Sequence, residues 1–387
     1  MGRATHLLLA AALGCAAAGP ASEGATRADV ALGFEAPSTE GRIALANLDG
    51  EIAVLEAQLA GPGARDALRL RTIDALLLRQ QVRADARDLG RALVLAEAVE
   101  GTGRSVAEGR VRDVRHEWDA ALALLPPGSR EAETIALARG ADPAAILALR
   151  DDRAAASPGF ATELDLAAAL NAAGRYDEAD AAYQRALAAY GGVSPFPVAF
   201  VQFARGVMWA ERAGRPELAR PLYEEAVRRS PAYVVANVHL AELEAEAGET
   251  DAAIARLERI AAESPDPEAP GLLGELLAER NPERAATLVA RARGTYEALL
   301  DVHRLAYVDH ATEFFLGPGD DAARALGLAE ENLANRDTER ARDLAIRAAE
   351  AAGELARACD LAKPFDARPV LTEPLAETLE ALDARCP

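Results

Sequence analysis

The residues best suited to chemistry are two histidines of one predicted helix. His303 and His310 lie seven positions apart with Tyr307 between them, so a helix would place all three on one face. Ligand pairs on a metal-binding helix are usually four residues apart. The spacing therefore favours helix packing for these side chains, and we predict no metal site.

No arrangement typical of catalysis accompanies the histidines. The sequence contains no GxSxG motif, P-loop or dinucleotide fingerprint. Gly101-Thr102-Gly103 falls between predicted helices, and the absence of a preceding strand argues against a phosphate-binding loop. Paired carboxylates are frequent, and we interpret them as solvated helix faces. We predict no catalytic residue and no cofactor, and hence a protein that is not an enzyme.

The N-terminal stretch MGRATHLLLAAALGCAAAGP has the layout of a signal peptide, with a basic start, an apolar core and small residues around Cys15. ALGC, ending at Cys15, resembles the lipobox of bacterial lipoproteins, in which the cysteine is acylated and becomes the new N-terminus. It departs from that pattern at Ala12, where leucine is usual, and at Leu13, where a small residue is common. We predict lipid attachment at Cys15 and a membrane-anchored protein facing the periplasm. A secreted protein and a cytoplasmic one are the alternatives.

The other two cysteines, Cys359 and Cys386, are an even number in an oxidising compartment. A disulfide between them would tie the C-terminal tail to the last long helix. Two free thiols are equally compatible with the sequence, because connectivity does not follow from spacing.

The composition indicates an acidic, almost wholly helical chain. Of the 387 residues, 50% are hydrophobic but only 4% aromatic, and alanine and leucine, both helix-favouring, dominate. No run alternates apolar and polar residues for long enough to predict a sheet. The net charge of −20 argues against nucleic acid as a partner, because such a surface repels phosphate.

A unit of about 34 residues recurs along the chain. GRYDEADAAYQRAL (174–187) places an alanine five residues and a bulky residue nine residues after its glycine. The same pattern follows Gly140, Gly214 and Gly248, so the spacings are 34, 40 and 34 residues. Glycine suits the turn between two helices, the alanine allows close approach, and the bulky residue fills the adjoining space. Acidic residues just after the turn, Asp177, Glu249 and Asp251, are predicted to cap the second helix.

These residues resemble the tetratricopeptide repeat (TPR) family, whose pattern orders glycine, aromatic, alanine, aromatic, alanine and proline. Pro231 and Pro265 occupy the proline position in two copies. The resemblance implies an all-α, right-handed solenoid of stacked antiparallel helix pairs, and the match is specific from about 160 to 265. We predict the following organisation: signal peptide 1–15, flexible tether 16–38, degenerate helical repeats 39–127, TPR repeats 128–265, degenerate TPR-like repeats 266–363, and a capping helix and tail 364–387.

In the TPR family the first helix of each pair lines a concave groove that binds peptides. The lysine clamp of some family members has no counterpart, because Lys363 is the only lysine. Five polar residues of predicted first helices are candidate partner-binding residues: Asn171, Arg205, Arg212, Glu242 and Glu246. The aromatic residues Phe196, Phe200, Phe203 and Trp209 are interpreted as core, with a partly exposed groove wall as the alternative.

The sequence thus favours a non-enzymatic scaffold that is lipid-anchored in the bacterial cell envelope. It would bind another protein or peptide in its concave groove. The alternative is a soluble TPR adaptor or regulatory subunit of an enzyme complex, either cytoplasmic or secreted.

Overall fold

The computed structural model describes residue 32 and residues 37–61, 65–101, 103–363 and 372–386. Cys15 and nearly all of the predicted tether lie outside these residues. All regular structure in the described ranges is helical, and they contain no strand, which confirms the all-α prediction. None of their helices combines the length and apolar character needed to cross a membrane.

The N-terminal half contains nine α-helices, with the following bounds: α1 (Gly41–Leu59), α2 (Asp66–Arg83), α3 (Ala86–Glu97), α4 (Gly103–Val114), α5 (Trp118–Leu124), α6 (Arg130–Ala138), α7 (Ala144–Ala156), α8 (Phe160–Ala172) and α9 (Tyr176–Ala189). The C-terminal half follows with α10 (Phe196–Val207), the π-helical turn η1 (Met208–Arg212), α11 (Pro216–Arg229), α12 (Val234–Glu246), α13 (Thr250–Glu263), α14 (Glu268–Leu277), α15 (Pro282–Leu316), α16 (Ala322–Asn335), α17 (Glu339–Ala351), α18 (Leu355–Ala362) and α19 (Glu373–Asp383).

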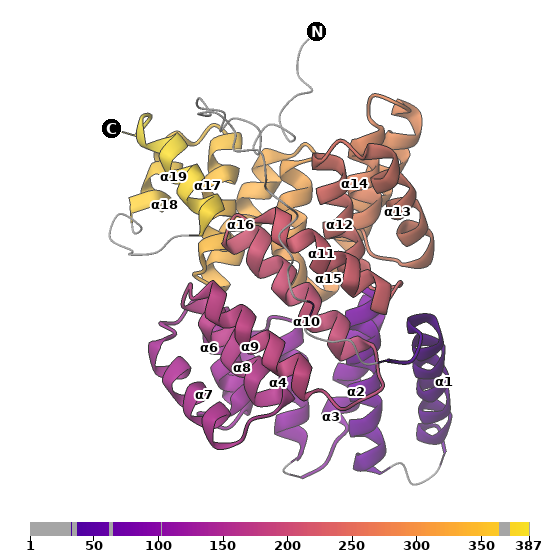
Figure 1. The fold of residues 1–387 in the computed structure, drawn as a ribbon. Coiled ribbons are helices and arrows are strands. Elements are labelled where there is room, and N and C mark those ends of the chain that lie inside the picture. Colours follow the sequence, from indigo (N-terminus) through magenta and orange to yellow (C-terminus); the bar gives the residue numbers. More distant parts are fainter. Residues whose placement is uncertain (1–31, 33–36, 62–64, 102, 364–371, 387) are drawn as a thin grey trace.

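Successive helices pack as neighbours throughout the chain. The closest pairs are α8 with α9, α10 with α11 and α12 with α13, followed by α14 with α15 and α15 with α16. Figure 1 shows these pairs stacked into a curved solenoid, with the N-terminal helices below and the C-terminal helices above. The predicted TPR-like solenoid is therefore the observed architecture.

Three of the four repeat copies bury the residues that their pattern predicts. Gly174, Gly214 and Gly248 open the second helices with positive φ angles of 72°, 62° and 79°, a conformation that favours glycine. At five, nine and twelve residues beyond each glycine, all side chains are at most 4% exposed: Ala179, Tyr183, Ala186, Ala219, Tyr223, Ala226, Ala253, Leu257 and Ile260. The packing role of this pattern is confirmed for these copies.

The copy at Gly140 does not pack as predicted. Gly140 has the expected positive φ, but Ala145 is exposed and Leu149 is 50% exposed. Helix α7 instead buries Arg150 and Ala154, one and five positions further along. The preceding helix α6 has only nine residues, so it is too short to cover the face that the pattern marks.

The predicted caps are also only partly correct. Asp177 and Asp251 lie in the first turns of α9 and α13, where the helix dipole favours a negative charge. Glu249 occupies the N-cap position of α13. Neither helix has a hydrogen bond from a capping side chain, so the acidic residues act on these helix ends through charge alone.

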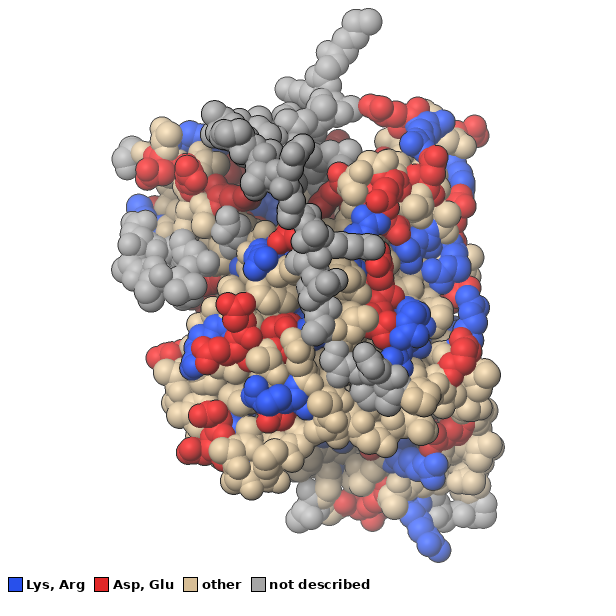
Figure 2. All heavy atoms as spheres, in the orientation of Figure 1, with Lys and Arg blue, Asp and Glu red and all other residues tan. Residues whose placement is uncertain are grey.

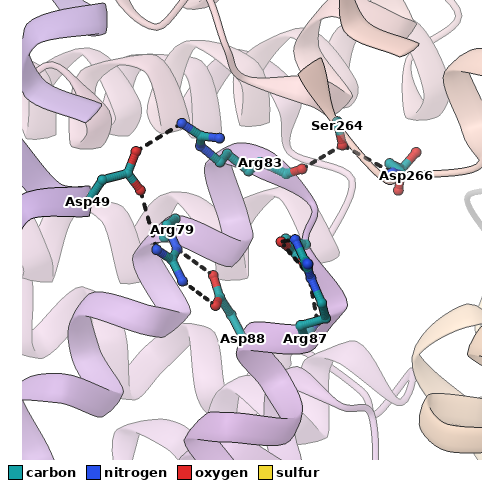
Figure 3. A network of polar contacts seen from close by, with 8 residues as sticks. Asp49, Arg79, Arg83, Arg87, Asp88, Ser264 and Asp266 are labelled. Atoms are coloured by element: carbon teal, nitrogen blue, oxygen red, sulfur yellow. Dashed lines mark hydrogen bonds and ion pairs between the residues drawn. The ribbon is translucent and has the colours of Figure 1, made fainter. Parts of the chain in front are cut away.

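The solenoid turns back on itself, so that its N-terminal helices contact its C-terminal ones. Ser264 Oγ, after α13, donates to the backbone oxygen of Arg83 at the end of α2, at 2.7 Å. Figure 3 shows this junction beside the ion pairs that join Arg79 of α2 to Asp49 of α1 and Asp88 of α3. Asn335 Nδ2, at the end of α16, donates to the His116 backbone oxygen at 3.1 Å. These contacts close the space that the first helices face.

Helix α15 is not straight, which separates the two histidines. His303 has non-helical angles (φ −130°, ψ 40°), and the helix kinks there. The His303 ring lies 2.8 Å from Arg115 Nη1, whereas His310 lies 3.4 Å from Glu268. The predicted shared face is therefore wrong, because the kink directs the two rings to partners on different helices. No group of three potential metal ligands occurs among the described residues.

The C-terminal helix covers the end of the solenoid. Helix α19 packs on α17, and its Leu375 and Leu382 are fully buried in the last core cluster. In the structure Cys359 of α18 and Cys386, beyond α19, are joined by a disulfide that closes a separation of 27 residues. The bridge fixes the capping helix to the body that it covers.

Candidate functional site

The five candidate partner-binding residues occupy different environments. Asn171 Oδ1 and Arg212 Nε are buried atoms with no hydrogen-bond partner. Glu242 is 44% exposed on α12 and lies 3.5 Å from the ring of His239, and Glu246 is exposed at the end of the same helix. These four residues remain candidates for contact with a partner.

Arg205 is a correction to the predicted basic spot. Its side chain is fully buried, and its Nε and Nη2 atoms donate to the two Asp180 carboxylate oxygens at 2.7 and 3.0 Å. Gln202 Oε1 accepts a further bond from it at 2.9 Å. Asp180 also accepts from Trp209 Nε1 at 3.2 Å. A guanidinium held in this way joins α9 to α10 and is not available to a partner.

The aromatic residues around α10 are mainly core, as interpreted from the sequence. Phe196 and Trp209 are 4% and 6% exposed, and Phe200 and Phe203 are partly buried. The Phe203 ring lies against the rings of Tyr233 and His239, with centroids 5.3 and 5.2 Å away. One edge of this core therefore borders the polar residues of α12.

Seven polar side chains meet on the first helices of successive pairs, and we call them the inner-helix cluster. They come from η1, α12, α14, α15 and α17, and each is between about a fifth and a half exposed: Glu211, His239, Glu242, Glu268, His310, Glu313 and Arg340.

Arg340 links the two ends of this cluster. Its Nη1 lies 2.9 Å from Glu211 of η1, and its Nη2 lies 2.9 Å from Glu313 of α15. Glu211 also lies 3.3 Å from His239 Nδ1. Residues 129 positions apart in the chain are thereby joined, and the two sides of the solenoid are held in a fixed relation.

The cluster is acidic, and its charges shift one another's ionisation. The carboxylates of Asp309 and Glu268 raise the pKa of His310 to about 10, so this ring carries a positive charge at neutral pH. Desolvation raises the pKa of Glu242, although its 44% exposure to water limits that effect. Four glutamates face one arginine and two histidines, which leaves an excess of negative charge.

The sequence did not reveal most of this cluster. Glu242 was a candidate because it lies on a first helix, but Arg340 and Glu313 lie in repeats too degenerate for the pattern to align. The available signal was the register of the first helices, extended to α15 and α17. The closure between η1 and α17 was invisible, because no local pattern encodes a contact over 129 positions.

The outer surface carries both charges in close mixture. On the face shown in Figure 2, acidic and basic side chains lie next to one another over the described helices, without a broad basic area. Many are ion pairs between neighbouring helices, such as Arg220 with Glu249 and Arg304 with Glu331. The inner-helix cluster is therefore the more distinctive polar surface.

Comparison with known proteins identifies the repeats. Two family models described as tetratricopeptide repeat match residues 164–234 and 210–276. No curated protein matches the chain in sequence.

Solved structures share the general architecture only. The Cut9–Hcn1 hetero-tetramer of the APC/C is 13% identical with a TM-score of 0.41, covering 87% of this chain and 73% of its own. Yeast Tom70 is 11% identical with a TM-score of 0.36, covering 89% and 94%. The TPR domain of P58(IPK) is 14% identical with a TM-score of 0.26, covering 89% and 95%. We infer no partner or activity from such distant similarity. The family models and the buried repeat pattern show that residues 164–276 contain tetratricopeptide repeats.

Proposed function

We propose that this protein is a non-enzymatic scaffold that binds a basic segment of another protein on the inner-helix cluster. The observation that carries the proposal is the cluster itself, an acidic, partly exposed surface built from the first helices of five successive elements. Repeat solenoids use such recessed surfaces for extended partners. An excess of carboxylates favours lysine and arginine side chains and disfavours nucleic acid.

A contact within the chain supports the same view. Gln202 Nε2 of α10 donates to the backbone oxygen of Leu32 at 2.6 Å, and the Leu32 side chain packs against the core of the repeats. These residues are 170 positions apart, so a repeat helix here holds a peptide group from a distant segment. The repeats thus have the means to bind main chain as well as side chains.

Site-specific photo-crosslinking tests the proposed binding surface. A photoreactive residue in place of Glu246, exposed at the end of α12, is expected to give a discrete crosslinked protein in cells. The same residue in place of Asp251, exposed on the second helix α13, is the matched control. The proposal fails if position 246 yields no product, or if both positions give the same products.

We propose in addition that Cys15 carries a lipid and anchors the protein to the envelope membrane, facing the periplasm. The support is the signal-like sequence that ends at this residue. A Cys15→Ser variant is expected to leave the membrane fraction and to lose incorporation of labelled fatty acid. Unchanged membrane association of Cys15→Ser would contradict the anchor and favour the soluble adaptor.

A further inference from the structure

A cavity of about 180 Å³ lies where the N-terminal helices meet α14 and α15. Its walls come from segments far apart in the sequence, and the residues that carry the argument are His116, Asp266, Glu268, Tyr296, Tyr307 and His310. The His310 side chain is 35% exposed, so water reaches this wall of the cavity.

Asp266 differs from every other buried carboxylate of the described residues. Ten aspartates and glutamates there are less than a tenth exposed, and nine of them form an ion pair with an arginine: Asp85, Asp88, Glu133, Glu163, Asp180, Glu225, Glu244, Asp309 and Asp343. The tenth, Asp266, is 7% exposed and has no basic partner among the described residues.

The hydrogen bonds around Asp266 do not replace that partner. Its Oδ1 accepts from the Glu268 backbone N–H at 2.9 Å, and its own N–H donates to Ser264 Oγ at 3.1 Å. In Figure 3 the arginines of this junction are joined to carboxylates, whereas Asp266 is joined only to Ser264. Because a buried carboxylate is costly without a counter-charge, this position calls for a cation.

Two tyrosines supply the rest of the site. Tyr296 and Tyr307 are 2% and 8% exposed and line the same cavity, and neither hydroxyl makes a hydrogen bond within the described part of the chain. Burial raises the pKa of both phenols, and the charges of Asp266 and Glu268 raise them further, so these carboxylates lie near the hydroxyls. The phenol oxygens can accept hydrogen bonds, and the ring faces attract cations.

The nearby charges favour one class of ligand. Glu268 already has His310 at 3.4 Å, so the uncompensated charge is that of Asp266. An anion would meet two carboxylates, and a neutral ligand would leave Asp266 unpaired. A guanidinium or alkylammonium group would donate to Asp266 and to the phenol oxygens while its charge faces the rings.

We propose that this cavity binds an organic cation, a guanidinium or alkylammonium group, with Asp266 as its counter-ion and Tyr296 and Tyr307 as its walls. The inference stands apart from the proposed scaffold function, because a small cation suffices to test it. The same group can arrive as a free amine or as a lysine or arginine side chain of a protein.

Isothermal titration of the full chain at pH 8 with agmatine is the test. Agmatine is expected to bind, whereas 1,4-butanediol, neutral and of similar length, is not. Asp266→Asn is expected to weaken agmatine binding by at least about tenfold, since it removes one charge of a buried pair. The matched control Asp251→Asn changes a 91%-exposed carboxylate and should bind as the unmodified protein does.

The outcomes separate clearly. An asparagine can still accept from the Glu268 N–H, so the Asp266→Asn chain should fold, and its helical circular dichroism spectrum checks this. A capped tripeptide with a central arginine distinguishes the sources: binding of both probes indicates a side chain, and binding of agmatine alone indicates a free amine. Absence of agmatine binding, or equal binding by folded Asp266→Asn, overturns the proposal.

Discussion

The buried ion pair between Arg205 and Asp180 offers the most direct test of the packing. We consider Arg205→Met, which retains an unbranched side chain of similar length but removes the charge and its donors. Arg205 is fully buried and Asp180 is 9% exposed, so the variant leaves a carboxylate facing an apolar side chain.

The magnitude follows from that burial. Removing one partner of a buried pair typically costs about 3–5 kcal/mol, because the remaining charge is left unsolvated. Trp209 and Gln184 still donate to Asp180, at 3.2 and 2.6 Å, which places the expected loss near the lower limit, about 3 kcal/mol. The exposed pair Arg175–Glu178, with side chains 48% and 58% exposed, is the control, and Arg175→Met should cost at most about 0.5 kcal/mol.

Urea unfolding followed by far-ultraviolet circular dichroism measures both effects. The comparison is valid if the slope of unfolding free energy against urea is the same in all variants. The double variant Arg205→Met/Asp180→Leu should recover much of the loss, because it also removes the stranded charge.

The reasoning is refuted if Arg205→Met is no more destabilising than Arg175→Met. That result would mean that the guanidinium does not carry the contact between α9 and α10. The original assignment of Arg205 to partner binding would then regain its basis.

Three further predictions follow from other features of the fold. Gly206→Ala should destabilise by about 1–3 kcal/mol in urea unfolding, since its Cβ would lie 2.3 Å from the Tyr223 ring, whereas Gly50→Ala, with open space around it, should stabilise slightly. Burial, reinforced by the charge of Glu268, raises the pKa of Asp266 from 3.8 to about 7, with the charge of His310 opposing the shift. Between these pH values the native state holds a proton that the unfolded chain has released, so stability should fall as pH rises through this window. Asp266→Asn should abolish that fall, worth at most about 4 kcal/mol in thermal or urea titrations across pH, and an unchanged profile would contradict the assignment. Reduction of the α18–α19 disulfide should cost about 3–4 kcal/mol for a separation of 27 residues, and intact-mass analysis with a thiol reagent should find neither cysteine free before reduction.

The sequence determined the local architecture wherever its pattern is strong. Glycine with positive φ, alanine at contact points and a bulky neighbour each respond to the geometry of one helix pair, so Gly174, Ala179 and Tyr183 can be interpreted without the rest of the chain. The same reasoning failed at Leu149, because burial there depended on the length of the neighbouring helix, which the pattern does not encode.

The candidate sites depended on the tertiary structure. Arg205 was taken for an exposed residue, but the partner that buries it, Asp180, belongs to the preceding repeat unit. Asp266 carried no signal at all, since its lack of a counter-charge is a property of its surroundings. Helix pairing is decided by contacts between neighbours in sequence, which repeat and leave a pattern. The closure of the solenoid and its cavity are decided by single contacts between distant segments, such as Arg340 with Glu211, and these leave none.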